Sequence, residues 1–199
     1  CEQVENPKES KGIVKREVTE VITSGTVMRP SLLNETDNNY LASVIKDGDN
    51  YGLAFSDIST GEFQAGEVKN LTDELNRIAT KEVILPEGTK FELPDRITIT
   101  RIEPYRFERD FALEMIKNHF GILKTDAFGI SEKSPSVCSA GALLSYIKEN
   151  QKTTLKHIKK ISPFNPRDCM SLDGATIKNL ELITRINGDA KGALLDTIN

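Results

Sequence analysis

The stretch from Asn39 to Val68 constrains the fold of this chain more than any other, because short apolar runs alternate in it with tight-turn signals. The runs Tyr40 to Ile45 and Tyr51 to Ile58 are followed by DGDN and by STG, residues that tolerate positive φ or hydrogen-bond their own backbone. A third run begins at Glu62. This pattern predicts an antiparallel meander of three strands.

Side chains in the first strand of this meander alternate between two faces, and both faces are largely apolar. The two sets are Leu41, Ser43 and Ile45, and Tyr40, Ala42 and Val44. A sheet with one wet face would carry polar residues at every second position, so we expect both faces to be covered. Three strands rarely stand alone, and the rest of the chain should therefore supply covering helices.

The remaining pattern predicts further strands and helices. We expect strands at Val14 to Ile22, Val83 to Leu85 and Ile97 to Ile102, a polar linker at Arg29 to Asn38, and helices from Asn70 to about Thr80, from Phe107 to Phe120, from Ser134 onward and from Asp173 onward. The first of these helices should bury Leu71, Leu75, Ile78 and Ala79. Gly121 should end the second, and Ser134 with Pro135 should start the third.

Composition excludes several classes of protein. No apolar run approaches the roughly 20 residues that a membrane-spanning helix needs. The three cysteines are far apart, which is typical of free thiols in a reducing compartment, and Cys138 is expected to be a buried apolar filler. Residues 31–67 hold seven acidic residues and one basic one, whereas residues 152–199 hold eight basic and five acidic residues. The meander is therefore a poor surface for DNA, and no phosphate-binding GxxxxGK is present.

Five strings resemble, in the same order, the MutS family of DNA mismatch repair proteins. They are CEQVENPKESKGIVKREVTEVITSGTV, LLNETDNNYLA, FSDISTGEF, CSAGALLSYIKENQKTTLKHI and MSLDGATIKNLEL. The resemblance implies that residues 1–28 end a mismatch-binding domain, residues 29–167 form the connector domain, and residues 168–199 start the helical core or lever domain. It implies a ribonuclease-H-like α/β fold, with a mixed sheet covered by helices, a β-rich N-terminal remnant and a helical C-terminal extension.

The same resemblance implies what the complete family member does and what lies outside this chain. The family reads mismatched double-stranded DNA, hydrolyses ATP with Mg²⁺, forms homodimers or larger assemblies and acts in the cytoplasm at the nucleoid. The mismatch-reading phenylalanine would lie before Cys1 and the ATPase after Asn199, so we expect this chain to be non-catalytic and to hold no cofactor or metal itself.

The first functional hypothesis is a relay and docking module. The family's connector meets MutL, and the polar side of the helix from Phe107 to Phe120, with the end of the next helix, is the candidate surface. Its residues are Glu114, Lys117, Asn118, Glu149 and Asn150. The alternative interpretation is that these are ordinary solvated helix positions, as charged residues usually are.

The second hypothesis is a metal-dependent nuclease of the ribonuclease-H type, which needs several carboxylates converging on two metal ions. That fold would place an acid in the middle of its first strand, and Tyr40 to Ile45 contains none. Asp57 and Glu62 flank a turn, where capping the turn is the common role of such residues.

The third hypothesis is auxiliary, non-specific binding of the DNA backbone. The lysine-rich stretch after the third helix could contact phosphates, together with two basic residues near the N-terminus. The residues are Lys152, Lys156, Lys159, Lys160, Lys15 and Arg16. The alternative is a solvated connection between two domains.

Overall fold

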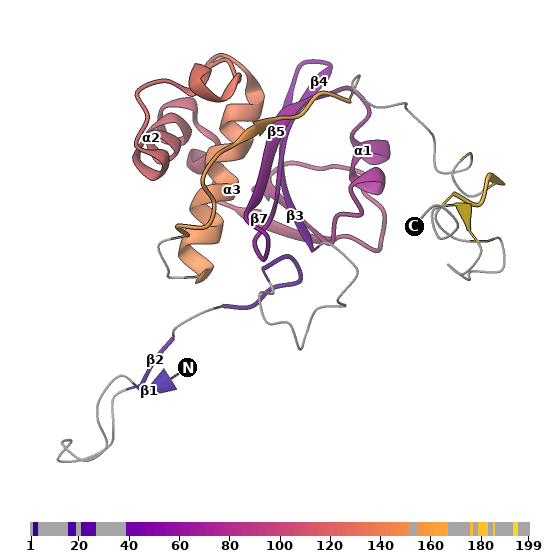
Figure 1. Ribbon diagram of the computed structural model, residues 1–199, viewed down its shortest axis with the longest axis horizontal. Helices are drawn as coiled ribbons and strands as arrows, with labels where there is room; N and C mark the ends of the chain where they lie inside the picture. The colour runs from indigo at the N-terminus through magenta and orange to yellow at the C-terminus, as the bar shows by residue number, and fades with distance from the viewer. Residues whose placement is uncertain are drawn as a thin grey trace.

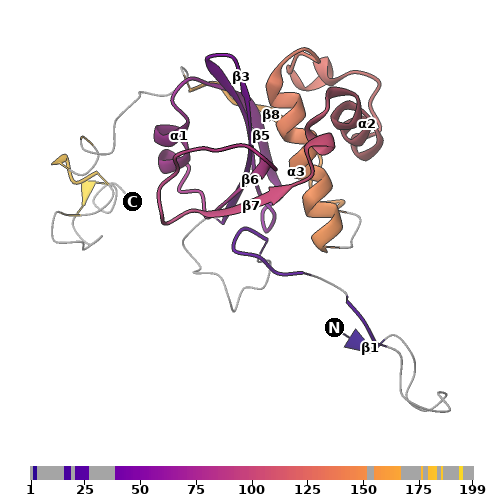
Figure 2. The same ribbon diagram turned by 180° about the vertical axis from the view of Figure 1, so that it is seen from behind.

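A computed structural model describes residues 2–3, 16–18, 21–26, 39–151, 155–166, 176, 179–182, 185 and 193–194. The main body is a six-stranded mixed sheet with helices on both faces (Figures 1 and 2). Its strands, in the order β7-β6-β3-β4-β5-β8, are β7 (Thr98–Ile102), β6 (Glu82–Pro86), β3 (Tyr40–Asp47), β4 (Asn50–Asp57), β5 (Glu62–Val68) and β8 (Ser162–Pro163). The mixed α/β architecture predicted from the sequence is confirmed.

The centre of the sheet is the predicted meander. Strands β3, β4 and β5 pair antiparallel, with Ala42 opposite Phe55 and Ala54 opposite Ala65. Strands β3 and β4 are joined by a two-residue turn at Gly48 and Asp49, where Gly48 adopts a φ of 58°. A positive φ is what such a short hairpin requires, so local turn chemistry sets the register here.

Both faces of the sheet are covered, as the alternation in β3 predicts. Leu41 belongs to a buried cluster on the side of α2 (Arg109–Phe120) and α3 (Pro135–Gln151). Ala42 and Val44 belong to a second cluster on the side of α1 (Leu71–Arg77). Figure 1 shows α1 on one side of the sheet and α2 with α3 on the other.

Helix α1 follows β5 directly and is capped as predicted, because the Asn70 side chain accepts a hydrogen bond from the backbone N–H of Asp73. The helix ends at Arg77 rather than near Thr80. The expectation that Ala79 lies on its buried face is wrong, since Ala79 has a φ of 56° and is exposed. The chain turns there, and Thr80 is buried instead.

The helix expected from Phe107 begins later than predicted. Residues Pro104–Phe107 form a short 3-10 turn, η2, and the α-helix α2 starts at Arg109. Phe107 is buried although it lies before the helix. Its apolar side chain therefore reflects packing in the core and does not belong to the apolar stripe of the helix. The helix ends as predicted at Gly121, which adopts a left-handed conformation with a φ of 65°.

Helix α3 is enclosed on almost every side. Only Lys148 and Glu149 of its 17 residues are not buried. It packs on β3, β4 and β5, and α2 crosses its other side so closely that a Cβ added at Gly141 would lie 2.3 Å from the Cα of Ala112. A helix with this burial is a central core element rather than a surface helix.

The chain ends carry fewer described residues. A separate antiparallel pair joins β1 (Glu2–Gln3) to β2 (Arg16–Glu17), so the expected strand at Val14 to Ile22 is seen only at Arg16–Glu17 among the described residues. The linker at 29–38 and most of the helix expected from Asp173 lie outside the described residues. Cys138 is buried, as expected. None of the described helices is long and apolar enough to cross a membrane.

Candidate functional site

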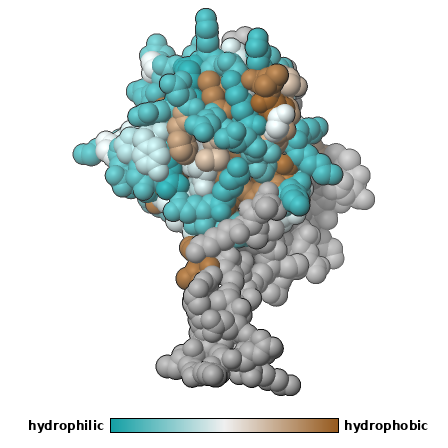
Figure 3. Space-filling view, turned by 90° about the vertical axis from the view of Figure 1, so that its left-hand side faces the viewer, coloured by the Kyte–Doolittle hydropathy of each residue, from teal (hydrophilic) through white to brown (hydrophobic). Residues whose placement is uncertain are grey.

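The outward face of α2 carries two of the predicted docking residues. Glu114 and Asn118 lie one helical turn apart and are both exposed. Figure 3 views the molecule from the side that carries α2, and hydrophilic residues dominate this surface, with smaller hydrophobic areas between them. These two side chains are therefore presented to solvent by a helix whose other side is anchored in the core.

Lys117 is less free than its neighbours on α2. Its Nζ lies 2.9 Å from Oε1 of Glu132, and the side chain is half-buried. The hydrogen bond from Lys117 lowers the pKa of the Glu132 carboxyl, against the opposing effect of desolvation. Lys117 thus ties α2 to the loop before α3.

Glu149 lies near the end of α3 and is exposed, but it is also paired. Nη1 of Arg106 donates to Oε2 of Glu149 at 2.6 Å, and Nε of Arg106 lies 2.8 Å from Oε2 of Glu103. Burial opposes the charge of Arg106, but the hydrogen bond and attraction of Glu149 outweigh it, and the pKa of the guanidinium is raised. This pair joins η2 to the end of α3 beside the α2 face.

Asn150 does not share this surface. It is buried, and its backbone carbonyl accepts a hydrogen bond from the N–H of Val21 at 2.8 Å. The adjacent Gln151 donates from Nε2 to the carbonyl of Thr26 at 2.9 Å. The structure therefore places Asn150 at a junction with residues 21–26, and the exposed docking candidates are Glu114, Asn118 and Glu149.

The most connected polar group of this junction is Glu82, which the sequence analysis did not single out. Its side chain is fully buried in β6 and accepts hydrogen bonds from three separate elements. The donors are the backbone N–H of Gly25 at 2.8 Å, the hydroxyl of Thr100 at 2.7 Å and the hydroxyl of Tyr146 at 2.9 Å. A signal was available, since Glu82 is an acidic residue directly before the apolar VIL of a buried strand.

The segment 21–26 fits tightly against this carboxylate. A Cβ on Gly25 would lie 2.8 Å from Cδ1 of Leu41 and 3.0 Å from Cβ of Glu82, so the close approach requires glycine. The Thr26 hydroxyl accepts from the N–H of Thr23 at 2.7 Å and closes the turn. Burial, and then the charge of Glu82, raise the pKa of the Tyr146 phenol, which stays protonated as a donor.

The acids considered for a nuclease are engaged in turn and strand contacts. Oδ1 of Asp57 accepts from the N–H and the hydroxyl of Ser59 at 2.8 and 2.6 Å, which is a turn-capping arrangement. Glu62 accepts from the hydroxyl of Tyr40 at 2.7 Å. Within the described parts of the chain, no group of three or more histidine, cysteine, aspartate or glutamate residues is placed to hold a metal ion.

The predicted DNA-backbone residues are only partly described. Lys156, Lys159 and Lys160 are exposed on the connection between α3 and β8. Lys15 and Lys152 lie outside the described residues, and of Arg16 only the backbone is described. The connection itself is held to α2, because Nε2 of His119 donates to the carbonyl of Ile158 at 3.1 Å.

Comparison with known proteins matches the chain to two family models. The model described as MutS domain II covers residues 39–159, and that described as MutS domain I covers residues 1–31. The chain is 40% identical to the DNA mismatch repair protein MutS of Dehalococcoides mccartyi over its whole length, and 38% identical to that of Halothermothrix orenii. These alignments cover 24% and 23% of the two relatives, so the chain spans about a quarter of their length.

Proposed function

Because this chain belongs to the MutS family of DNA mismatch repair proteins, we propose that its α/β body is the connector between a mismatch-binding domain and a helical core. In this assignment residues 1–28 end the mismatch-binding domain, residues 29–167 form the connector with a ribonuclease-H-like fold, and residues 168–199 begin the core. The six-stranded mixed sheet with helices on both faces supports the fold assignment.

A connector must transmit movement, and two features of the described residues support that role. The body has two buried clusters on a shared sheet, which makes it stiff. The N-terminal segment 21–26 is held to that body by Glu82, Asn150 and Gln151. Coupling between sites needs packed elements with discrete arrangements, and a specific hydrogen-bonded junction can supply such an arrangement.

The connector also presents a docking face, which we assign to MutL. The observation that carries this assignment is the exposure of Glu114 and Asn118 on a helix whose opposite side is buried, beside the exposed Glu149. Lys117 and Arg106 are already paired with carboxylates of the same domain. Glu114, by contrast, is in none of the ion pairs found among the described residues, and it therefore favours a partner surface that brings a basic residue.

The test is a titration of the 199-residue chain with MutL from the same source, followed by NMR at two salt concentrations. We expect saturable binding that falls at least about tenfold in Glu114→Lys, since reversing a charge at the centre of an interface replaces attraction by repulsion. Asp95→Lys makes the same charge change at an exposed position of the β6–β7 connection and is the matched control. A folded chain that does not bind, or equal losses in the two variants, would refute the assignment.

For the complete family member we propose the activities that its relatives' name indicates: recognition of mismatched double-stranded DNA in repair. We also propose that the complete protein uses ATP with Mg²⁺ and forms a homodimer or larger assembly, through sites outside this chain. We propose that this chain itself catalyses no reaction. We further propose that the complete protein acts in the cytoplasm, where the DNA that it repairs lies.

A further inference from the structure

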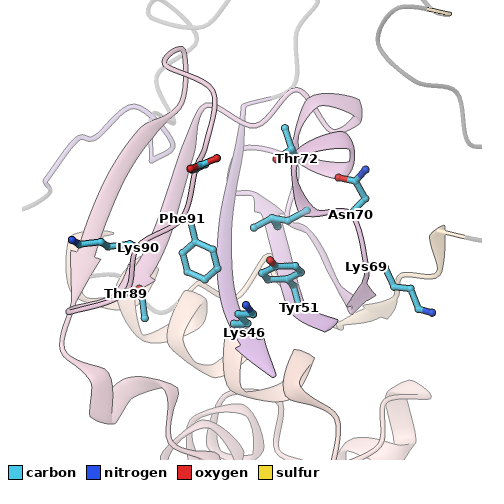
Figure 4. Close-up of a pocket in the computed structure, with 10 residues that line it drawn as sticks. Lys46, Tyr51, Lys69, Asn70, Thr72, Thr89, Lys90 and Phe91 are labelled. Atoms are coloured by element: carbon cyan, nitrogen blue, oxygen red, sulfur yellow. The ribbon is translucent and has the colours of Figure 1, made fainter. Parts of the chain in front are cut away.

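A cleft of about 650 Å³ opens at one edge of the sheet, beside α1 (Figure 4). It is formed by the end of β3, the start of β4, the residues that join β5 to α1, and the connection after β6. The lining residues are Lys46, Tyr51, Lys69, Asn70, Leu71, Thr72, Thr89, Lys90, Phe91 and Glu92. Its volume is within the range of small-ligand sites in proteins.

The position of this cleft in the fold favours binding. Strands β3, β5 and β6 run in the same direction, so their carboxyl ends meet at one edge of the sheet. Lys46, Lys69 and Thr89 lie at or just after those ends. Ligands of open α/β sheets bind outside the carboxyl ends of the strands. The cleft lies on the α1 side of the sheet and is separate from the α2 face assigned to MutL.

An aromatic pair forms the middle of the cleft. The rings of Tyr51 and Phe91 have centroids 5.8 Å apart and planes inclined at 56°. Both residues are half-buried and pack against the apolar cluster under α1, so the rings are held while part of each remains accessible. Every nucleobase has a flat face that can stack on such rings.

Three lysines flank this pair, and in Figure 4 the side chains of Lys69 and Lys90 extend outward from the cleft. Lys46, Lys69 and Lys90 are exposed, and none of the ion pairs found among the described residues involves them. In Figure 4, Lys90 and Lys69 lie on opposite sides of the cleft, and Lys46 lies between them near the rings. Among the ten lining residues Glu92 is the one acid. A chain of phosphates crossing the cleft would meet a positive charge on each side and at its centre.

We propose that this cleft binds a short segment of single-stranded nucleic acid. A base stacks on Tyr51 and Phe91, while Lys46, Lys69 and Lys90 contact phosphates at separate points along the strand. The lysines on opposite rims favour a strand that continues past the cleft over a free nucleotide, which has phosphate on one side only. Aspartates 47 and 49 in the neighbouring hairpin oppose long-range attraction, so stacking is needed as well as charge.

The probe is a fluorescein-labelled (dT)8 strand titrated with the 199-residue chain and followed by anisotropy. We expect the slope of log K against log salt to be about −2, because each of three phosphates contributes about −0.7 for a single strand. Phe91→Leu and Tyr51→Leu keep an apolar side chain and should each lower the affinity at least about fivefold by removing a stacking face. Lys90→Gln should lower the affinity and make the slope shallower by roughly 0.7.

Four controls decide the outcome. The variant with Lys81, Lys124 and Lys133 all changed to Gln removes three exposed lysines outside the cleft and should bind like the wild type. An abasic strand of equal length and free dTMP should each bind more weakly than (dT)8. Equal binding of the abasic strand, equal binding of dTMP, displacement of (dT)8 by polyglutamate at matched charge, or a loss in the three-lysine variant as large as that in Phe91→Leu would each overturn the proposal.

Discussion

Replacing Glu82 removes the acceptor to which three donors of the junction are directed. The backbone N–H of Gly25 comes from the N-terminal segment, the Thr100 hydroxyl from β7 and the Tyr146 hydroxyl from α3. The three donors are not equivalent. A hydroxyl can rotate toward another acceptor, whereas the N–H of Gly25 is fixed by the turn that contains it.

The cost of Glu82→Ala can be worked from these contacts. One buried donor left without a partner costs about 1–3 kcal/mol, and the one lost methylene contributes about 0.8 kcal/mol of burial. We therefore expect the free energy of unfolding to fall by about 2–4 kcal/mol. Glu82→Gln is the matched isostere. Its Oε1 can accept from Gly25 and its Nε2 can donate to the hydroxyl oxygens of Thr100 and Tyr146, so its cost should be about 1 kcal/mol.

The assay is urea unfolding followed by circular dichroism, combined with hydrogen exchange of the Gly25 and Val21 amides. Both amides should exchange faster in Glu82→Ala than in Glu82→Gln, since their acceptors belong to the same junction. Glu87→Ala, at an exposed position at the other end of β6, controls for the loss of a negative charge. A cost of Glu82→Ala below about 1 kcal/mol, or unchanged exchange at the Gly25 amide, would show that Glu82 does not hold this junction together.

Two further predictions concern the packing and titration of α2. Gly141→Ala places a Cβ against Ala112 and should lower the free energy of unfolding by about 1–3 kcal/mol. Ala142→Ser, one position along the same helix, should leave the α2 crossing intact. A Gly141→Ala variant as stable as the wild type would contradict the close approach of the two helices. Burial lowers the pKa of His119, against the opposing bond to Ile158, so folding favours the neutral ring and stability should decline as the pH falls below about 6.5. Urea midpoints between pH 7.5 and 5 should decline less in His119→Gln than in the wild type, because Gln can still donate to the carbonyl of Ile158. If the two proteins show the same decline, His119 does not cause it.

Local chemistry explains which parts of the fold could be predicted. The meander depends on turn residues and alternation within 30 residues, and the capping of α1 depends on Asn70 and a backbone N–H three residues later. Both are contained in short stretches of sequence. The start of α2 was mispredicted because Phe107 is buried by tertiary packing before the helix begins.

The sites depend on contacts between distant residues, and these were predicted less well. Exposure of Glu114 and Asn118 follows from one helical period, so their surface position was predictable. Asn150 was assigned to the surface with Glu149 as the polar end of its helix, whereas α3 is buried on nearly all sides. The role of Glu82 requires Gly25, which lies 57 positions away in the sequence. The cleft lysines come from the end of β3 and from two later connections, and no single window of sequence unites them.

The enclosure of α3 has a mechanical consequence. A helix of 17 residues is a rod about 25 Å long, and this one is clamped by the sheet on one side and by α2 at Gly141 on the other. Because of these contacts, α3 can neither translate along its axis nor rotate about it without moving its neighbours. A pull on Gln151 through Thr26 must therefore tilt the rod together with α2, and a tilt of about 5° over that length displaces the far end by about 2 Å. The size of the displacement at the far end of α3 would then be set by the length of this one buried helix.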